Sequence, residues 1–226
     1  MVAIVVALVV IAAVLAPQFW VSHVLKRHKA ERPDLPGTGG ELARHLVERF
    51  GLDGVTVERT LAGDHYDPET RTVRLTDDIH DGRSLSAVAV AAHEIGHAIQ
   101  HHRNERGLRL RGTMVRVAMV TDKFAGVFFL LAPVLAVLAR TPVAFFALAG
   151  VGIAFLAIRV LVHLVTLPVE YDASYGKALP ILRDGGYLSD EDMAPTRSVL
   201  KAAALTYVAA ALMSLLNLAR WARILF

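Results

Sequence analysis

Residues 93–97 read His-Glu-x-x-His, a pattern suited to holding a metal ion beside a water molecule. Residues four apart lie on one face of an α-helix, so the imidazoles of His93 and His97 would converge on a single ion. Zinc held in this way keeps a position for water and lowers the pKa of that water to ~7. Glu94 would stand beside the water, where a carboxylate acts as a general base. The pentapeptide therefore predicts zinc-dependent hydrolysis of a carbonyl compound.

The residues around this motif predict the helix that carries it. Ser84 is the expected N-cap. Gly96 costs roughly 1 kcal/mol relative to alanine in a helix interior, which indicates that another backbone or a substrate approaches closely there. His101 and His102 are expected to be interfacial or solvated rather than ligands. Apolar residues at helical spacing would bury the face opposite the two histidines: Leu85, Val88, Ala92, Ile95 and Ile99.

Catalytic zinc usually has three protein ligands, so one more must come from elsewhere in the chain. Arg103 occupies the place where an extended form of the motif has a third histidine. Glu170 is the predicted third ligand, because two apolar stretches separate it from His97 and an even number of crossings would return it to the same side of a membrane. Two alternatives stay open: Asp172 as the direct ligand, or an interfacial carboxylate at position 170 that binds nothing.

Four long apolar stretches account for a chain in which 54% of the 226 residues are hydrophobic. Each is long enough, at ~1.5 Å per residue, to cross a hydrocarbon core of ~30 Å. The first lacks a preceding basic segment and a clear cleavage site, which predicts an uncleaved anchor. Basic residues follow it at positions 26–32 and precede the second stretch at positions 103–116, and they predict a site on the cytoplasmic side.

The predicted fold is that of a mainly α membrane protein, with four transmembrane helices and a small cytoplasmic α/β zincin-like domain that carries the HExxH helix. The predicted segments are an N-terminal transmembrane anchor at 1–25, the α/β domain at 26–112, a transmembrane hairpin at 113–167, a cytoplasmic segment with the third ligand at 168–198, and a C-terminal transmembrane helix at 199–226.

Within the α/β domain, apolar spacing predicts a helix over residues 41–50, ended by Gly51. Alternating residues predict strands at 55–59 and 72–76, with residues 64–68 in the connection between them. The strand around Val73 is expected to pair with an extended substrate by edge addition.

One face of the third apolar stretch carries polar residues at spacings of four, three and four: Arg159, His163, Thr166 and Glu170. Ionisable groups at that depth seldom face lipid. They either line an active-site cleft that dips into the bilayer, or they snorkel to the interface or bond to a neighbouring helix. Residues 122–123, an aspartate and a lysine, are expected to form an interfacial pair.

The absence of cysteine excludes disulfides and thiolate zinc sites. The small net charge of +3 comes mostly from arginines next to apolar stretches, and the chain has no basic stripe with interleaved aromatic residues. Nucleic acid is therefore not an expected partner. The expected partners are a peptide or membrane-protein substrate and membrane lipid.

With these residues placed, the chain resembles the YugP-type family of neutral zinc metallopeptidases of prokaryotic membranes over nearly its whole length. The resemblance rests on an N-terminal anchor, DHYDP at 64–68, VAAHEIGHAIQH at 90–101 and LPVEYDAS at 167–174. It implies one zinc ion per chain, with Glu94 as the base and with three ligands: His93, His97 and Glu170.

The chain is more distantly similar to the HtpX and CAAX prenyl proteases, integral-membrane gluzincins whose third ligand is the glutamate of an E-x-x-A-D segment. Glu170 and Ala173 fit that pattern. Ser174 stands where those families have an aspartate, so the carboxylate that the similarity implies near the ligands is missing. Asp172 is its expected replacement.

Hydrolysis also needs a donor near the developing oxyanion. The candidates for this role are His65, Tyr66, Arg159 and Tyr171, and His163, Asp172 and Ser174 are further candidates for groups around the site. For residues 64–68 the alternative is a tight turn formed by the Asp-Pro pair.

The leading hypothesis is a zinc metalloendopeptidase of the prokaryotic cell membrane, multi-pass, with its active site facing the cytoplasm and a substrate in or near the membrane. One alternative is a non-catalytic, zinc-stabilised membrane scaffold or adaptor. An intact Glu94 argues against it, because a structural zinc site has no use for a base. A zinc hydrolase acting on a lipid amide or ester is the other alternative, and it would use the same ligands.

Overall fold

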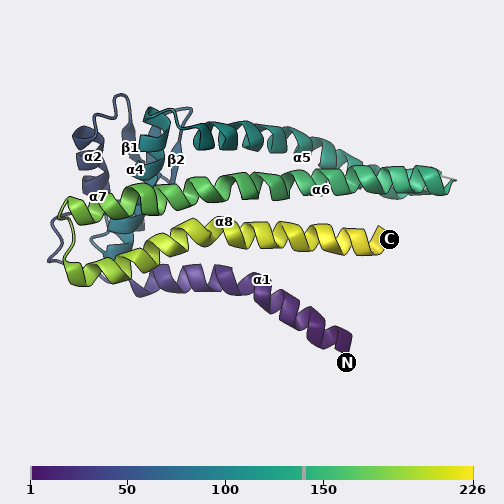
Figure 1. Ribbon diagram of the computed structural model, residues 1–226, viewed down its shortest axis with the longest axis horizontal. Coiled ribbons are helices and arrows are strands. Elements are labelled where there is room, and N and C mark those ends of the chain that lie inside the picture. Colours follow the sequence, from purple (N-terminus) through teal and green to yellow (C-terminus); the bar gives the residue numbers. More distant parts are fainter. Residues whose placement is uncertain (1, 139–140, 226) are drawn as a thin grey trace.

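The computed structural model describes residues 2–138 and 141–225, which form a mostly helical protein with one small sheet. The helices are α1 (Val2–Arg27), α2 (Gly39–Arg49), α3 (Asp77–His80), α4 (Leu85–His102), α5 (Arg106–Leu138), α6 (Pro142–Tyr171), α7 (Leu179–Asp184) and α8 (Asp190–Leu225). A π-helix, η1 (Asp172–Ala178), joins α6 to α7. The sheet, α2 and α4 lie at one end of the molecule, and α5, α6 and α8 extend away from that end (Figure 1).

Three short strands make up the sheet: β1 (Thr56–Arg59), β2 (His65–Asp67) and β3 (Thr72–Leu75). Their order is β1-β3-β2, with β1 parallel and β2 antiparallel to β3. The expectation that residues 64–68 only connect two strands is wrong, because three of these residues form β2. The expectation that the strand around Val73 accepts a substrate is also wrong, because Val73 pairs with Val57 on one side and with Tyr66 on the other.

Local capping explains where two of the helices begin. Thr38 and Glu41 form a capping box at the start of α2, with each side chain accepting a bond from the backbone N–H of the other. Gly51 follows α2 with a φ of +56°, a conformation that suits glycine at a helix end. At the start of α4, the Ser84 hydroxyl accepts a bond of 3.1 Å from the N–H of Ala87. The predicted helix near residues 41–50 and the predicted N-cap of α4 are both confirmed.

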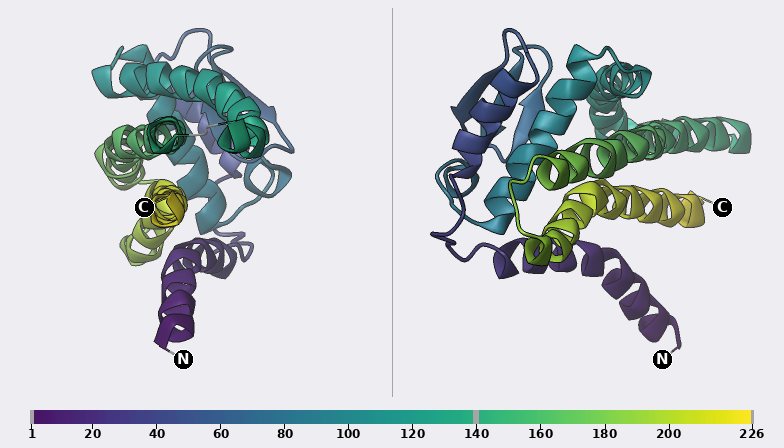
Figure 2. Two further views of the ribbon diagram at one scale, coloured as in Figure 1. Left: turned by 90° about the vertical axis from the view of Figure 1, so that its right-hand side faces the viewer. Right: turned by 60° about the vertical axis from the view of Figure 1, so that its left-hand side comes forward.

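Helix α4 is the central element of the fold. Its residues from Leu85 to Gln100 are all buried, which is unusual for a helix that carries charged groups. It packs against α2 on one side and against η1 and α8 on the other. Figure 2 shows α4 between the layer of the sheet and α2 and the layer of the long helices. A fully enclosed α4 can hold its polar residues in fixed positions.

The described residues contain one helical run that is long and apolar enough to cross a membrane, Phe146–Asp184. The prediction of four transmembrane helices is therefore wrong for this part of the chain. Four arginines in the first third of α5 shorten its apolar part, and α8 begins with three acidic residues and buries Val199 and Leu200 in the core. Residues 1, 139–140 and 226 of the predicted spans lie outside the described residues.

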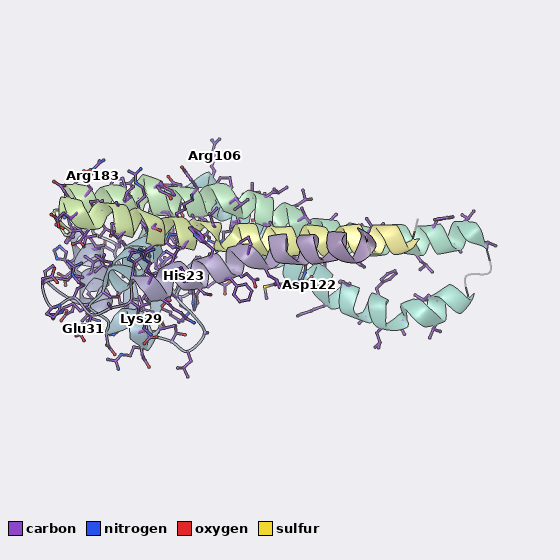
Figure 3. All side chains as sticks on the ribbon, turned by 90° about the horizontal axis from the view of Figure 1, so that it is seen from below. His23, Lys29, Glu31, Arg106, Asp122 and Arg183 are labelled. Carbon is purple, nitrogen blue, oxygen red and sulfur yellow. The ribbon has the colours of Figure 1, made fainter. Side chains whose placement is uncertain are left out.

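Polar and apolar side chains are distributed unevenly along the molecule. The labelled side chains of Lys29 and Arg183 lie at the end that carries the sheet and α2 (Figure 3). Along α5 and α6 large apolar side chains remain exposed, including Phe124 (65%) and Leu130 (78%). An exposed apolar surface of this extent marks a contact with lipid or with a partner.

Candidate metal centre

His93, His97 and Glu170 form a buried cluster between α4 and the end of α6. Nε2 of His93 lies 3.1 Å and Nε2 of His97 lies 3.3 Å from Oε2 of Glu170. The three side chains each offer one ligand atom within 4.8 Å of the others, and none of the residues is more than 4% exposed. The fold thus brings together the two motif histidines and the acid that was predicted 73 residues beyond His97.

The end of α6 shows how Glu170 reaches α4. The helix continues past Pro168 and changes to the π-helix η1 immediately after Tyr171. Short π segments inside helices are frequent at functional sites. Here η1 lies directly against α4 and buries Ala173 and Ser174 there.

Gly96 is the point of closest backbone approach between α4 and η1. A Cβ atom at this position would lie 2.7 Å from the carbonyl oxygen of Ala173 and 3.2 Å from its Cα. The sequence-based expectation of a close approach at Gly96 is confirmed. Glycine at this position lets η1 carry Glu170 close to the two histidines.

We expect Gly96→Ala to lower the free energy of unfolding by up to about 2 kcal/mol. The overpacking cost lies at the upper end of ~1–3 kcal/mol because the contact is with backbone atoms, and it exceeds the gain of ~1 kcal/mol in helix propensity. Displacement of η1 should also weaken metal binding. Denaturant unfolding and metal titration measure the two effects. Gly150→Ala in α6 is the control, since no atom lies within 4 Å of its Cβ position. A Gly96→Ala protein as stable as wild type would contradict the packing argument.

Gln100 fixes the tautomer of His97. The Gln100 side-chain amide donates to the carbonyl of Val169 (2.9 Å) and to Oδ2 of Asp172 (2.8 Å), so its Oε1 faces His97. Oε1 can only accept, and it lies 2.9 Å from Nδ1 of His97. The proton of a neutral His97 ring therefore resides on Nδ1, and Nε2 presents a lone pair to Glu170.

Ser174 does the same for His93. Its hydroxyl donates to the carbonyl of Leu200 (3.1 Å), so its oxygen accepts from Nδ1 of His93 at 2.9 Å. The similarity to families with an aspartate at this position implied a missing carboxylate. The structure shows that the Ser174 hydroxyl itself contacts the ligand histidine, whereas Asp172 acts one step farther away through Gln100.

The donor set of the cluster fits Zn²⁺. Two imidazole lone pairs and one carboxylate oxygen point at a common centre, and three acceptors repel one another unless a cation or a shared proton lies among them. Two histidines and one glutamate form a ligand set of catalytic zinc sites. His93, His97 and Glu170 could therefore hold a metal ion.

Glu94 is buried beside the cluster, with 6% of its surface exposed. Burial raises the pKa of Glu94 to about 7; the nearby Glu170 carboxylate adds to this effect, and His93 and Arg111 oppose it. A carboxyl group with a pKa near neutrality exchanges protons readily at physiological pH, which is the property required of a general base.

A cavity of about 510 Å³ adjoins the cluster at His97. β2, the end of α4 and the start of α5 supply its walls, and Tyr66 and His101 both line it. The Tyr66 hydroxyl lies 2.7 Å from Nδ1 of His101, and burial raises the pKa of Tyr66 to about 12, which keeps the phenol neutral. Residues 64–68 thus contribute to a wall of this cavity. The tight turn that was the alternative for this segment also forms, directly after β2, where the Asp67 side chain accepts a hydrogen bond from the N–H of Glu69.

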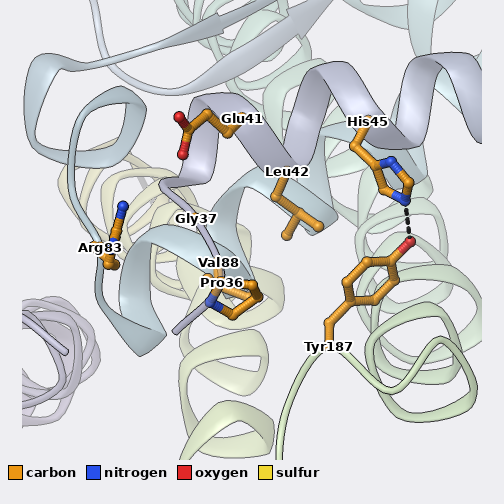
Figure 4. A pocket seen from close by; sticks show the side chains of 8 residues that line it. All are labelled: Pro36, Gly37, Glu41, Leu42, His45, Arg83, Val88 and Tyr187. Carbon is orange, nitrogen blue, oxygen red and sulfur yellow. Dashed lines mark hydrogen bonds between the residues drawn. The ribbon is translucent and has the colours of Figure 1, made fainter. Parts of the chain in front are cut away.

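A second cavity, of about 370 Å³, lies between α2 and the start of α4 (Figure 4). A hydrogen bond of 2.8 Å between His45 and Tyr187 lies on its wall. None of the cluster residues lines it. The first cavity is therefore the candidate substrate cleft.

Several sequence-predicted site residues are exposed or have partners outside the cluster. Arg159 forms an ion pair of 2.7 Å with Asp122 of α5, which supports bonding to a neighbouring helix and replaces the predicted pairing of residues 122–123. Tyr171 is 62% exposed, and Nδ1 of His65 lies 2.8 Å from the carbonyl of Gly63.

The remaining candidate, His163, precedes Glu170 by seven residues, which is about 10 Å along α6. Its side chain is half-buried. Of the candidates around the site, the structure places Ser174 against His93 and Asp172 one contact farther away, beside Gln100.

Sequence reasoning missed two residues that contact the cluster. Gln100 lies three residues after His97, on the same helix face, so its spacing was a usable signal. Arg111 lies 2.9 Å from Glu170, but it follows other arginines next to an apolar stretch and was attributed to membrane flanking. Nothing in the sequence separates Arg111 from those neighbours.

Comparisons with known proteins agree with this geometry. The model of the family described as "Putative neutral zinc metallopeptidase" matches residues 2–226. The chain is 38% identical over 209 residues to "Putative membrane protease YugP" of Bacillus subtilis (strain 168). The aligned region covers 92% of this chain and 89% of the relative. No solved structure matches the chain significantly, and the zincin-like class expected for the α/β unit is not shown. The chain belongs to this family of neutral zinc metallopeptidases.

Proposed function

We propose that the protein is an integral-membrane zinc metalloendopeptidase of the gluzincin type, with one zinc ion per chain. The observation that carries the proposal is the convergence of two imidazole lone pairs and one carboxylate oxygen beside a buried glutamate. The adjoining cavity gives a substrate access to this point. The family membership supports the same activity.

Each residue of the cluster has a defined task in this proposal. His93, His97 and Glu170 hold the ion, and Gln100 keeps one imidazole oriented. Zinc, when bound, supplies an acidic water and polarises the carbonyl oxygen of the substrate. Glu94 accepts a proton from the attacking water and delivers it to the leaving amine nitrogen.

Tyr66 is the proposed oxyanion donor, because it lines the same cavity as His97 and its hydroxyl stays protonated. We expect Tyr66→Phe to lower kcat about 10²-fold, as loss of one such donor does, while the zinc affinity stays unchanged. Steady-state peptide hydrolysis and a zinc titration test this. Tyr171→Phe is the matched control. The Tyr171 side chain is exposed at the end of α6, so this variant should keep the wild-type kcat. Equal kcat values for the two variants would exclude Tyr66 from this role.

We further propose that the substrate is a membrane or membrane-proximal protein and that the site faces the cytoplasm. The cleft extends along α5 to Val115 and Met119, where the helix surface is apolar and exposed. Phe146–Asp184 is the helical run that would anchor the protein in the membrane, and the relative is named a membrane protease. Lys177 and Arg183 near the end of this run favour the cytoplasmic orientation.

Removal of the metal tests the activity. We expect a chelator to abolish hydrolysis of a peptide library by the detergent-purified protein, and one equivalent of zinc to restore it. Zinc that binds without turnover of peptides or lipids would point to a scaffold. Cleavage of lipid amides or esters, with peptides left intact, would point to a lipid hydrolase. Either result would contradict the proposed peptidase.

A further inference from the structure

We propose that Arg111 is a positioning residue that holds Glu170 so that this glutamate binds the metal through one oxygen only, Oε2. The proposal rests on the proposed metal site. It concerns how the third ligand is held, which neither the HExxH motif nor the family membership specifies.

The two oxygens of the Glu170 carboxylate have different partners. Oε2 lies 3.1 Å and 3.3 Å from the Nε2 atoms of His93 and His97, whereas Oε1 lies 2.9 Å from Nη1 of Arg111. A carboxylate can bind a metal ion through one or both oxygens. The positive charge of the guanidinium next to Oε1 favours the first mode, because it attracts the oxygen that the second mode needs. Among the described residues Oε1 accepts no hydrogen bond, so the interaction is electrostatic.

Burial makes this ion pair consequential. The side chain of Glu170 is 2% exposed and that of Arg111 is 21% exposed. A buried carboxylate that loses its charged partner is strongly destabilised and turns toward the nearest remaining cation. In a metal-loaded site without Arg111, that cation would be the metal ion, and Oε1 would be drawn to it.

Arg111 differs in this respect from the other arginines of its helix. Arg106, Arg109 and Arg116 are exposed, whereas Arg111 is half-buried and lies 2.9 Å from Glu170. The guanidinium is always protonated in proteins, so Arg111 attracts the Glu170 carboxylate at any physiological pH. Through Arg111, α5 becomes the third element that shapes the site, after α4 and α6.

Binding through one oxygen has a consequence for the reaction. Two imidazoles and one carboxylate oxygen are three ligands, which leaves a position for water in a four-coordinate site. A second oxygen from Glu170 would compete for that position. Arg111 would thus keep the site open for the water that Glu94 deprotonates.

The test uses the full-length protein in detergent, loaded with Co²⁺ in place of zinc. The visible ligand-field absorption of Co²⁺ is more intense in four-coordinate than in five-coordinate sites, and competition with a chelator gives the affinity. We expect Arg111→Met to reduce the absorption several-fold. It should also weaken Co²⁺ binding by about 10–100-fold, the effect typical of the loss of a group that orients a ligand. Arg111→Lys should restore part of both. Arg106→Met removes the same charge from an exposed position of α5 and should match wild type.

The outcomes are distinguishable. A wild-type protein with intense absorption, together with an Arg111→Met protein of the same absorption and affinity, would overturn the positioning role and leave the metal site intact. A wild-type protein that takes up no Co²⁺ would overturn the metal site itself. If Arg111→Met does not fold, Arg111→Lys decides: weaker absorption than wild type supports the role, and an identical spectrum contradicts it.

Discussion

Glu94→Gln is expected to lower kcat for peptide hydrolysis by about 10²–10⁴-fold while one zinc ion per chain stays bound. Glutamine keeps the shape of the side chain but cannot accept the proton of the attacking water. Glu94 is not one of the three ligand side chains, so the metal should remain. Metal analysis and steady-state kinetics on the same preparation measure both quantities.

A matched control is available on the surface of α2. Glu48 is exposed there and belongs neither to the cluster nor to the lining of the adjoining cavity, so Glu48→Gln should keep both the metal and the normal kcat. A Glu94→Gln protein that hydrolyses peptides at the wild-type rate would remove Glu94 from the role of base. It would leave the metal site untouched, which separates the two parts of the proposal.

Glu170→Ala is the second variant with a large expected effect, namely the loss of bound zinc. Removal of a direct ligand should weaken zinc binding by more than the ~10–100-fold that follows loss of an orienting group. This variant keeps the two imidazole ligands but lacks the carboxylate oxygen that lies beside both Nε2 atoms. Chelator competition against purified protein gives the affinity, and circular dichroism shows whether the fold is kept.

Asp172→Ala is the control that separates the two acids considered from the sequence. Asp172 contacts Gln100 and Lys177 but neither histidine, so its loss should weaken zinc binding no more than about 10–100-fold. The reverse order, with zinc lost from Asp172→Ala and kept by Glu170→Ala, would make Asp172 the ligand.

The parts of the fold that depend on local sequence were predictable. The N-cap at Ser84, the glycine after α2 and the close approach at Gly96 each follow from the conformational preferences of a single residue. The two motif histidines followed from the helical repeat. Their convergence with Glu170 required a long-range argument about the chain, and the structure brings these residues together by packing η1 against α4.

Other features depend on tertiary contacts that a sequence does not encode locally. Residues 65–67 form a strand because β3 offers them an edge, although an aspartate and a proline favour a turn. The apolar residues of α8 predicted a transmembrane helix, yet Val199 and Leu200 are buried in the core. Hydropathy alone does not distinguish residues that face lipid from residues that face α4. Arg111 was missed for a related reason, since only the fold sets it apart from neighbouring arginines.

The most direct measurement is an anomalous difference map, collected at the zinc absorption edge from crystals of the zinc-loaded protein. The account predicts one peak per chain, within bonding distance of Nε2 of His93, Nε2 of His97 and Oε2 of Glu170. A peak held by other residues, or no peak between α4 and the end of α6 in protein shown to contain zinc, would contradict it.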